Sequence, residues 1–214
     1  MIDSKIIKTD KIILPNVSRE TLKELEDYSR SILNTNKKIN LISSSTEKSI
    51  KTRHIYDSAQ TIDFIENKDI TICTVLGSGA GLPSIVLGIL MKSKKQGFKL
   101  IFYEKSYHKS NFLKEMAKKF KLEADVYQKN IFEEKNLVTD VIICRAFKPL
   151  PVIFDIATKN FKNFKYIVMY LGKSGKKILQ NVSTKWKFDL EEMKSLTSDE
   201  SSVVKISNLK KNYE

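Results

Sequence analysis

Residues 75–85 read Val-Leu-Gly-Ser-Gly-Ala-Gly-Leu-Pro-Ser-Ile, and this stretch decides the fold class. An apolar strand runs into glycines at positions 77, 79 and 81, and a helix opens with Pro83. Glycine lets the backbone turn tightly and approach a ligand closely, because it has no Cβ. The helix start offers unpaired N–H groups to a polar or anionic ligand. The stretch therefore predicts a nucleoside-cofactor site at the end of a first strand, with Gly77 and Gly79 among its contacts.

Other features decide whether this loop is more than an ordinary tight turn. The strict dinucleotide pattern Gly-x-Gly-x-x-Gly is not met, because Leu82 stands at its last position. Glu104 closes the next predicted strand, where a carboxylate can accept hydrogen bonds from both ribose hydroxyls. Arg145 ends the fourth strand, and its planar guanidinium suits a cofactor carboxylate or a substrate phosphate. The alternatives are a solvated acid at Glu104 and a surface ion pair at Arg145.

Strand-like and helical stretches alternate after residue 70, which predicts an α/β fold with a doubly wound, mostly parallel sheet. The expected β segments are Ile70–Leu76, Lys99–Glu104, Ala124–Lys129, Asp140–Cys144, Tyr166–Leu171, Trp186–Leu190 and Val203–Ser207. The expected helices between them are Leu82–Lys95, Tyr107–Lys121 and Leu150–Phe161.

The N-terminal part has a helical pattern instead, so we expect a small helical extension over residues 1–66 and a Rossmann-like domain over residues 67–208. Ser18 is the expected N-cap of a first helix. Ser44 and Glu47 fit a capping box at the start of a second helix.

The charge is concentrated in two segments. The 214-residue chain has a formal net charge of +13. Residues 92–121 hold ten lysines against two glutamates, and residues 159–187 hold eight lysines and no acid. Such segments indicate contact with a polyanion such as a nucleic acid. The alternative is a bias in nucleotide composition, because only four of the 38 basic residues are arginine.

The remaining composition narrows the class of protein. No run of about 18 apolar residues could span a membrane, and the first residues lack the apolar stretch of a signal peptide. Cys73 and Cys144 lie in apolar strand-like runs, which favours buried thiols in a reducing compartment. Two histidines and two such cysteines form no metal-ligand cluster. We therefore expect a cytoplasmic protein without a metal. The sequence leaves the oligomeric state open, with a monomer as one option.

Three motifs in this order resemble one family. They are Arg-His-x-x-Asp-Ser at residues 53–58, Gly-Ser-Gly-Ala-Gly-Leu-Pro at 77–83 and Arg-Ala-Phe at 145–147. Further matching positions are Asn36–Leu41, Glu104, Lys109, Phe112–Leu113 and Leu171–Lys173. The chain resembles the class I S-adenosylmethionine methyltransferases and, within them, the small-subunit ribosomal RNA methyltransferase G family, also called GidB. The resemblance covers residues 36–173.

The resemblance implies methylation of guanine N7 in small-subunit ribosomal RNA, with S-adenosylmethionine as the cofactor and the RNA or the assembled subunit as the partner. It implies that Gly77 and Leu82 line the cofactor, that Phe132 and Glu133 lie by its adenine, and that Arg145 closes the site. Guanine N7 carries a lone pair and no proton, so the reaction requires no general base. No catalytic residue is assigned.

Three residues are weaker candidates for substrate contacts. Arg53 and His54 share a predicted helix with Asp57. In the functional alternative they face the cofactor crevice or RNA. In the structural alternative Arg53 forms a local ion pair with Asp57, and His54 is half-buried and braces the helical unit against the sheet. Lys173 follows the fifth strand and is a candidate phosphate or guanine contact.

The sequence also departs from the family pattern. The family usually has Trp, Asp and Gly where this chain has Thr35, Val75 and Ser84. The missing carboxylate at Val75 normally steadies the loop or the cofactor's amino group. Val75 motivates one alternative, a degenerate methyltransferase scaffold that binds RNA without catalysis. A separate alternative keeps the cofactor but changes the acceptor to a small molecule or a protein.

Overall fold

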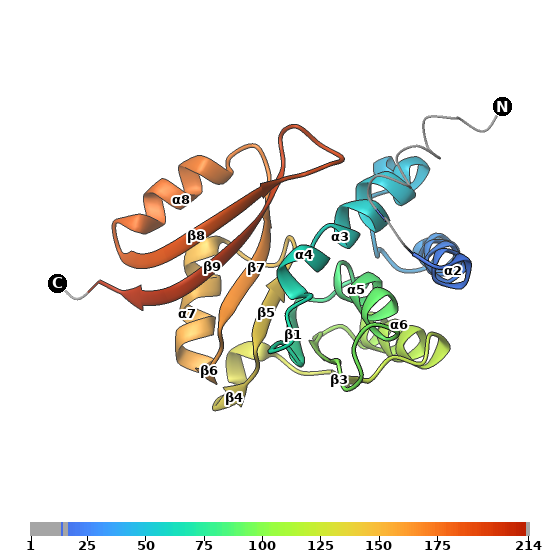
Figure 1. The fold of residues 1–214 in the computed structure, drawn as a ribbon, viewed down its shortest axis with the longest axis horizontal. Helices are drawn as coiled ribbons and strands as arrows, with labels where there is room; N and C mark the ends of the chain where they lie inside the picture. The colour runs from blue at the N-terminus through green and yellow to red at the C-terminus, as the bar shows by residue number, and fades with distance from the viewer. Residues whose placement is uncertain (1–13, 15–16, 213–214) are drawn as a thin grey trace.

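A seven-stranded sheet with helices on both faces forms the centre of the protein (Figure 1). The computed structural model describes residue 14 and residues 17–212. The strand order is β3-β2-β1-β5-β7-β9-β8. The strands of this sheet are β1 (Ile72–Leu76), β2 (Lys99–Tyr103), β3 (Ala124–Tyr127), β5 (Val141–Cys144), β7 (Tyr166–Leu171), β8 (Trp186–Lys194) and β9 (Ser202–Lys211).

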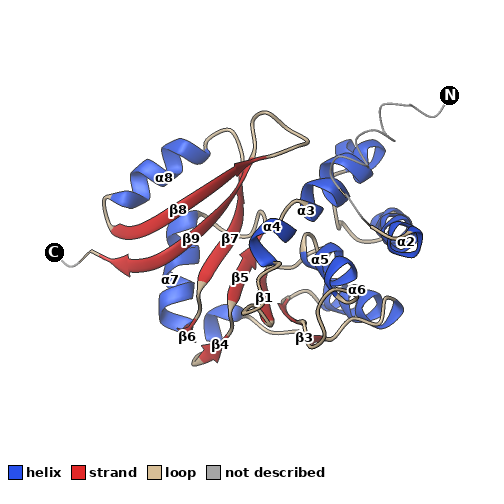
Figure 2. Cartoon of the chain, viewed as in Figure 1, coloured by secondary structure: helices blue, strands red, loops and turns tan. Residues whose placement is uncertain are grey.

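Helices and one small ribbon complete the fold (Figure 2). The helices are α2 (Arg19–Asn36), α3 (Asp57–Ala59), α4 (Ile62–Ile65), α5 (Ser84–Met91), α6 (Tyr107–Lys119), α7 (Leu150–Asn160) and α8 (Gly175–Ser183). The 3-10 helices η1 (Ser44–Ser49) and η3 (Ile131–Glu133) flank them, and η2 (Lys51–Tyr56) is a π-helix. The strands β4 (Leu137–Val138) and β6 (Phe161–Asn163) pair separately.

The predicted α/β class is confirmed by the sheet topology. Four neighbouring pairs, from β3 across to β7, are parallel, and β9 pairs antiparallel with both β7 and β8. The chain leaves β1 toward β2 and β3, and then returns to β5 on the other side of β1. This reversal is the point at which a doubly wound sheet opens a ligand crevice, at the carboxyl ends of its strands.

The burial pattern explains why helices cover both faces. Val141 and Ile143 belong to the core cluster that includes α2, α5 and α6 residues, whereas Ile142 and Cys144 belong to the cluster under α7 and α8. Successive residues of a strand point to opposite faces. A strand that is apolar at every position therefore needs a covering layer on each side.

The N-terminal helices pack onto the same core as the sheet. Tyr28 of α2 is fully buried, and its hydroxyl donates a 2.6 Å hydrogen bond to the carbonyl of Ala80 in the glycine loop. Ser18 accepts a hydrogen bond from the amide of Thr21, so the predicted N-cap is confirmed. The division at residue 66 stays a prediction, and most of residues 1–16 lies outside the described part.

The predicted capping box at Ser44 and Glu47 is wrong. Ser43 takes the N-cap position without a side-chain hydrogen bond. Glu47 instead accepts a 2.5 Å hydrogen bond from Nδ2 of Asn36, whose Oδ1 accepts from the amides of Leu41 and Ile42. A side chain at the end of α2 thus organises the turn, and the next segment is a 3-10 turn followed by a π-helix rather than one regular helix.

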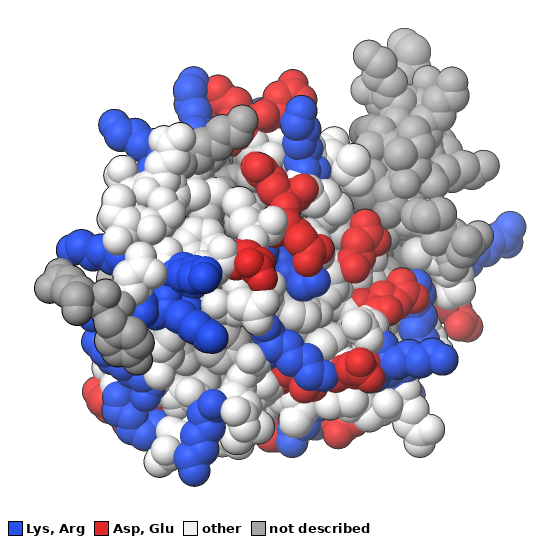
Figure 3. Space-filling model, turned by 60° about the vertical axis from the view of Figure 1, so that its left-hand side comes forward, with Lys and Arg blue, Asp and Glu red and all other residues white. Residues whose placement is uncertain are grey.

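Charged side chains of both signs cover the surface. Figure 3 shows Lys and Arg side chains around much of one face, with several Asp and Glu side chains near its centre. In residues 17–212, no helix is both long and apolar enough to cross a membrane.

Candidate functional site

The loop after β1 has a conformation that requires glycine. Gly77, Gly79 and Gly81 have φ angles of +62°, +53° and +87°, a region that residues with a Cβ rarely adopt. A Cβ at Gly77 would lie 2.0 Å from Cδ2 of Phe147. The glycine spacing therefore provides both a tight turn and a close approach of the Phe147 ring.

The Glu104 carboxylate joins this loop to the start of α6. Its Oε2 accepts a hydrogen bond from the Gly79 amide and its Oε1 accepts one from the Ser106 amide, each at 2.9 Å. Only 9% of Glu104 is exposed. Each carboxylate oxygen has two lone pairs, so each can still accept a hydrogen bond from a ligand. This geometry suits the predicted ribose role.

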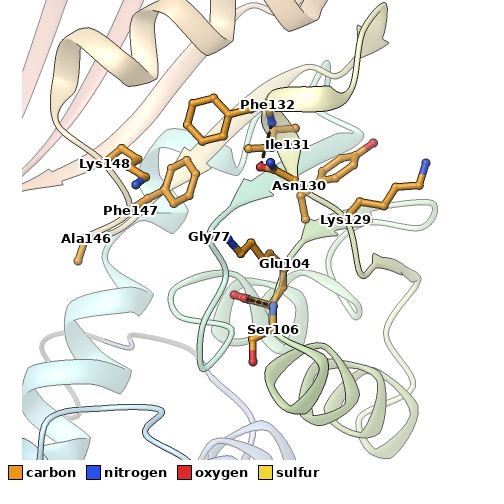
Figure 4. Close-up of a pocket in the computed structure, with 12 residues that line it drawn as sticks. Gly77, Glu104, Ser106, Lys129, Asn130, Ile131, Phe132, Ala146, Phe147 and Lys148 are labelled. Atoms are coloured by element: carbon orange, nitrogen blue, oxygen red, sulfur yellow. Dashed lines mark hydrogen bonds between the residues drawn. The ribbon is translucent and has the colours of Figure 1, made fainter.

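A cavity of about 650 Å³ lies against this carboxylate, at the carboxyl ends of β1, β2, β3 and β5 (Figure 4). We call it the cofactor cavity. Its size falls within the range of about 300–1,000 Å³ that is typical of small-molecule sites. The lining residues are Gly77, Tyr103, Glu104, Lys105, Ser106, Lys129, Asn130, Ile131, Phe132, Ala146, Phe147 and Lys148.

Two aromatic rings border the cavity opposite the carboxylate. Figure 4 shows Phe132 and Phe147 above Gly77 and Glu104, and the ring centroids are 6.5 Å apart. Phe132 is 44% exposed, but its backbone is fixed. The Oδ1 atom of Asn130 accepts a hydrogen bond from the Phe132 amide at 3.4 Å. The buried Asn160 of α7 donates to the carbonyl of the preceding Ile131 at 2.7 Å.

The structure brings some of the predicted cofactor residues together and leaves others apart. Gly77, Glu104 and Phe132 line the cavity, and Gly79 is bonded to Glu104. Leu82 is buried in the core, and Glu133 accepts a hydrogen bond from Asn130 outside the lining. The cofactor roles of Leu82 and Glu133 stay predictions.

Sequence reasoning missed several lining residues. Phe147 and Lys148 lie two and three residues after the predicted Arg145, within and next to the Arg-Ala-Phe motif, so the motif located the segment but not its contacts. Asn130 was detectable as an N-cap after β3, a position that favours Asn.

Arg145 points away from the cavity, toward the N-terminal helices. Its Nη2 donates to Oδ2 of Asp57 at 2.8 Å and to the carbonyl of Arg53 at 2.9 Å, and its Nη1 donates to Ser58 at 3.2 Å. The guanidinium carbon lies 4.8 Å from the centroid of the Tyr170 ring. The ion pair considered from the sequence exists, although it is mostly buried. The cofactor role of Arg145 stays a prediction.

Asp57 gathers donors from three parts of the chain. It is 6% exposed. Besides Arg145, it accepts hydrogen bonds from Gln60 at 2.8 Å, from Ser195 at 2.9 Å and from Thr197 at 3.2 Å. The carboxylate therefore connects the helical segment, the end of β5 and the loop between β8 and β9. The expected local pairing of Arg53 with Asp57 is replaced by this long-range pair.

His54 lies on the π-helix next to Arg145. Its Nε2 is 2.8 Å from the hydroxyl of Thr46, and its buried Nδ1 has no hydrogen-bond partner within the described residues. Burial, with the positive charges of Arg145 and Arg53, lowers the pKa of His54 to about 4. The ring is therefore neutral at pH 7. A neutral, partly buried ring agrees with the structural alternative considered from the sequence, in which His54 braces the helical segment.

Lys173 lies apart from the cofactor cavity. Its ammonium is 2.8 Å from a Glu200 carboxylate oxygen, and both side chains are exposed. Exposed ion pairs are weak, so this pair leaves Lys173 available to a competing anion. Its substrate role stays a prediction.

The chain accommodates Val75 where the family usually has Asp. Val75 is 1% exposed and packs in the core. The loop is restrained by the hydrogen bond from the Gly79 amide to Glu104. In the described residues there is no group of three or more His, Cys, Asp or Glu side chains that could hold a metal ion.

This sheet, its glycine loop and the carboxylate at the next strand end define the fold of class I S-adenosylmethionine-dependent methyltransferases. Solved structures agree on the fold. The chain is similar to an O-methyltransferase from Bacillus cereus in complex with SAH, with a TM-score of 0.62, 11% identity and coverage of 95% of this chain and 97% of that one. It is also similar to a SAM-dependent methyltransferase from Aquifex aeolicus, with a TM-score of 0.57, 14% identity and coverage of 79% and 98%.

Sequence comparison gives the family. The family described as GidB, rRNA small subunit methyltransferase G, matches residues 21–205. A ribosomal RNA small subunit methyltransferase G from Pelagibacter ubique is 43% identical over 198 residues, which are 92% of each chain. Another from Bartonella henselae is 34% identical over 200 residues, again 92% of each. The chain belongs to the GidB family.

Removal of the Asp57 carboxylate should destabilise the protein. Asp57→Ala leaves the mostly buried Arg145 guanidinium without its counter-charge, and we expect the free energy of unfolding to fall by about 3 kcal/mol in urea denaturation. Glu26→Ala, which breaks the exposed pair with Lys51, is the matched control and should cost less than about 1 kcal/mol. An equally small loss for Asp57→Ala would show that the pair does not hold these segments together.

His54 should make stability depend on pH. Between pH 6.5 and about 4 the unfolded chain takes up a proton at this histidine that the folded protein does not accept. Stability is therefore lost as the pH falls through this window, on the order of 1–2 kcal/mol for a partly exposed ring. The difference between wild type and His54→Gln in urea midpoints from pH 7 to pH 4 isolates this contribution. Parallel profiles for the two proteins would contradict it.

Proposed function

We propose that this chain transfers the methyl group of S-adenosylmethionine to N7 of a guanine in small-subunit ribosomal RNA. The observation that carries the proposal is the Glu104 carboxylate, which faces the cofactor cavity beside a glycine loop with left-handed backbone. Membership of the GidB family supports both the cofactor and the acceptor.

The residues around the cavity suit this cofactor. Glu104 would accept hydrogen bonds from the ribose hydroxyls, and the exposed face of Phe132 would pack against the adenine. At Gly79 the space of a Cβ is open, with the Gly77 carbonyl oxygen as the nearest atom at 3.9 Å, which leaves room for the methionine part to approach the backbone. Arg145 would take part only after release from Asp57.

Methylation of guanine N7 requires the protein mainly to position the two reacting groups. When bound, S-adenosylmethionine supplies a methyl group on a positively charged sulfur. The N7 lone pair forms the new N–C bond as the C–S bond breaks, and the electron pair of that bond stays on sulfur. No proton leaves N7, so no general base is needed. What the protein contributes is alignment of N7 with the methyl carbon at near-attack distance.

The charge of the chain supports an RNA substrate. A formal net charge of +13 favours a polyanion, and we propose that residues 92–121 and 159–187 bind phosphates. Arg53, His54 and Lys173 are proposed as further RNA contacts. The substrate is the ribosomal RNA or the assembled subunit. We place the reaction in the cytoplasm, in keeping with the buried free thiols of Cys73 and Cys144.

The proposal is tested by transfer of labelled methyl from the cofactor to small subunits and to purified ribosomal RNA that lack the modification, followed by mapping of the methylated base. We expect label on N7 of one guanine in at least one of these substrates. Absence of transfer to both, or label on another atom, would contradict the proposal.

A variant links this activity to the site. Glu104→Gln removes the charge and one of the acceptor oxygens, so the dissociation constant for S-adenosylhomocysteine should rise about 10- to 100-fold in isothermal titration calorimetry. Glu123→Gln is the control, because Glu123 is exposed just before β3, at the opposite end of the strand from the cavity.

A further inference from the structure

A second, smaller cavity adjoins the cofactor cavity. It has a volume of about 130 Å³ and lies between the carboxyl ends of β5 and β7. We call it the β5–β7 cavity. Its walls are mainly apolar and include Cys144, Leu150, Ile153, Met169, Leu171 and Ile178. Ala146, Phe147 and Lys148 line both cavities, so the two spaces meet at this segment.

The proposed reaction requires a space of this kind, and the inference rests on that proposed function. The acceptor atom has to lie in line with the methyl carbon, about 3–3.5 Å away. The acceptor base must therefore occupy a space that is continuous with the cofactor cavity. An apolar cavity of about 150 Å³ accepts benzene, so the β5–β7 cavity is of the right size for one ring of a base, with the second ring at its mouth.

The shared segment offers two groups that suit a guanine. Phe147 is a half-buried aromatic ring on the boundary between the cavities, where a base can stack on it. The Lys148 side chain is exposed, and it has no ion-pair or hydrogen-bond partner within residues 17–212. An ammonium donates to guanine O6, the acceptor next to N7, whereas adenine has a donor amino group at that position.

The neighbouring depression around Lys173 is less suited to the base that reacts. Its lining includes Glu192, Asp199 and Glu200 as well as Lys173 and Lys194. This depression shares no lining residue with the cofactor cavity, so a base bound in it would not adjoin the cofactor.

We propose that the β5–β7 cavity binds the guanine ring of the substrate RNA, with Phe147 stacked on the ring and Lys148 donating a hydrogen bond to O6. The site selects guanine through Lys148 and holds N7 toward the cofactor cavity.

The test measures binding without turnover. Guanosine 5′-monophosphate and the 2-aminopurine ribonucleotide, which lacks O6, are titrated into the full chain saturated with S-adenosylhomocysteine, and binding is followed by saturation-transfer NMR. We expect the guanine nucleotide to bind more tightly. Phe147→Leu should weaken the binding of both nucleotides at least about fivefold, because the base loses its stacking contact. Lys148→Met should remove the preference for guanine, and Lys148→Arg should retain it.

Lys68→Met is the matched control, because Lys68 is an exposed lysine just before β1, at the amino end of that strand and outside both basic segments. It should keep both affinities within twofold, and urea midpoints verify that each variant folds. Unchanged binding and preference in both Phe147→Leu and Lys148→Met would overturn the proposal, as would displacement of the guanine nucleotide by S-adenosylhomocysteine.

The outcome is separable from that of the proposed function. If wild type transfers methyl to ribosomal RNA while Phe147→Leu and Lys148→Met retain its kcat/KM, the cavity assignment fails and the function stands. If wild type transfers no methyl but its guanine binding is lost in these variants, the function fails and the binding site stands.

Discussion

The hydrogen bonds that Glu104 accepts from the amides of Gly79 and Ser106 are the constraint on which the site depends. The parallel pairing of β1 and β2 sets Leu76 opposite Tyr103, so the glycine loop and Glu104 leave the sheet side by side. One carboxylate then fixes both the loop and the start of α6.

A second constraint positions the segment after β5, which forms the wall of the cofactor cavity opposite Glu104. Arg145 is bound to Asp57 and stacked over Tyr170, so the chain turns sharply after β5, with Ala146 at a φ of +50°. This turn presents Phe147 and Lys148 to the two cavities. Within the described residues, the N-terminal helices therefore shape the site indirectly, through this buried ion pair and the hydrogen bond from Tyr28 to Ala80, and none of their side chains lines the cofactor cavity.

The sequence was sufficient wherever local pattern and strand geometry act together. Apolar runs located the main strands within a few residues, and the residue after β2 had to lie beside the glycine loop, so Glu104 was predictable. The partners of side chains that lie far apart in the sequence were not predictable. Asn36 donates a hydrogen bond to Glu47, which prevents the capping box. Asp57 forms its ion pair with Arg145, which lies 88 positions away in the sequence. The helix α8 was also missed, although its apolar residues Ile178, Leu179 and Val182 recur at helical spacing. The strands β4 and β6, of two and three residues, are too short to show a pattern.

The central claim is that Glu104, at the crevice beside β1, holds the cofactor by its ribose. The most direct measurement is a crystal structure of the chain with S-adenosylhomocysteine. The ribose hydroxyls should lie within hydrogen-bond distance of the Glu104 carboxylate, with the adenine against Phe132. A ligand bound elsewhere, or a ribose without contact to Glu104, would contradict the claim.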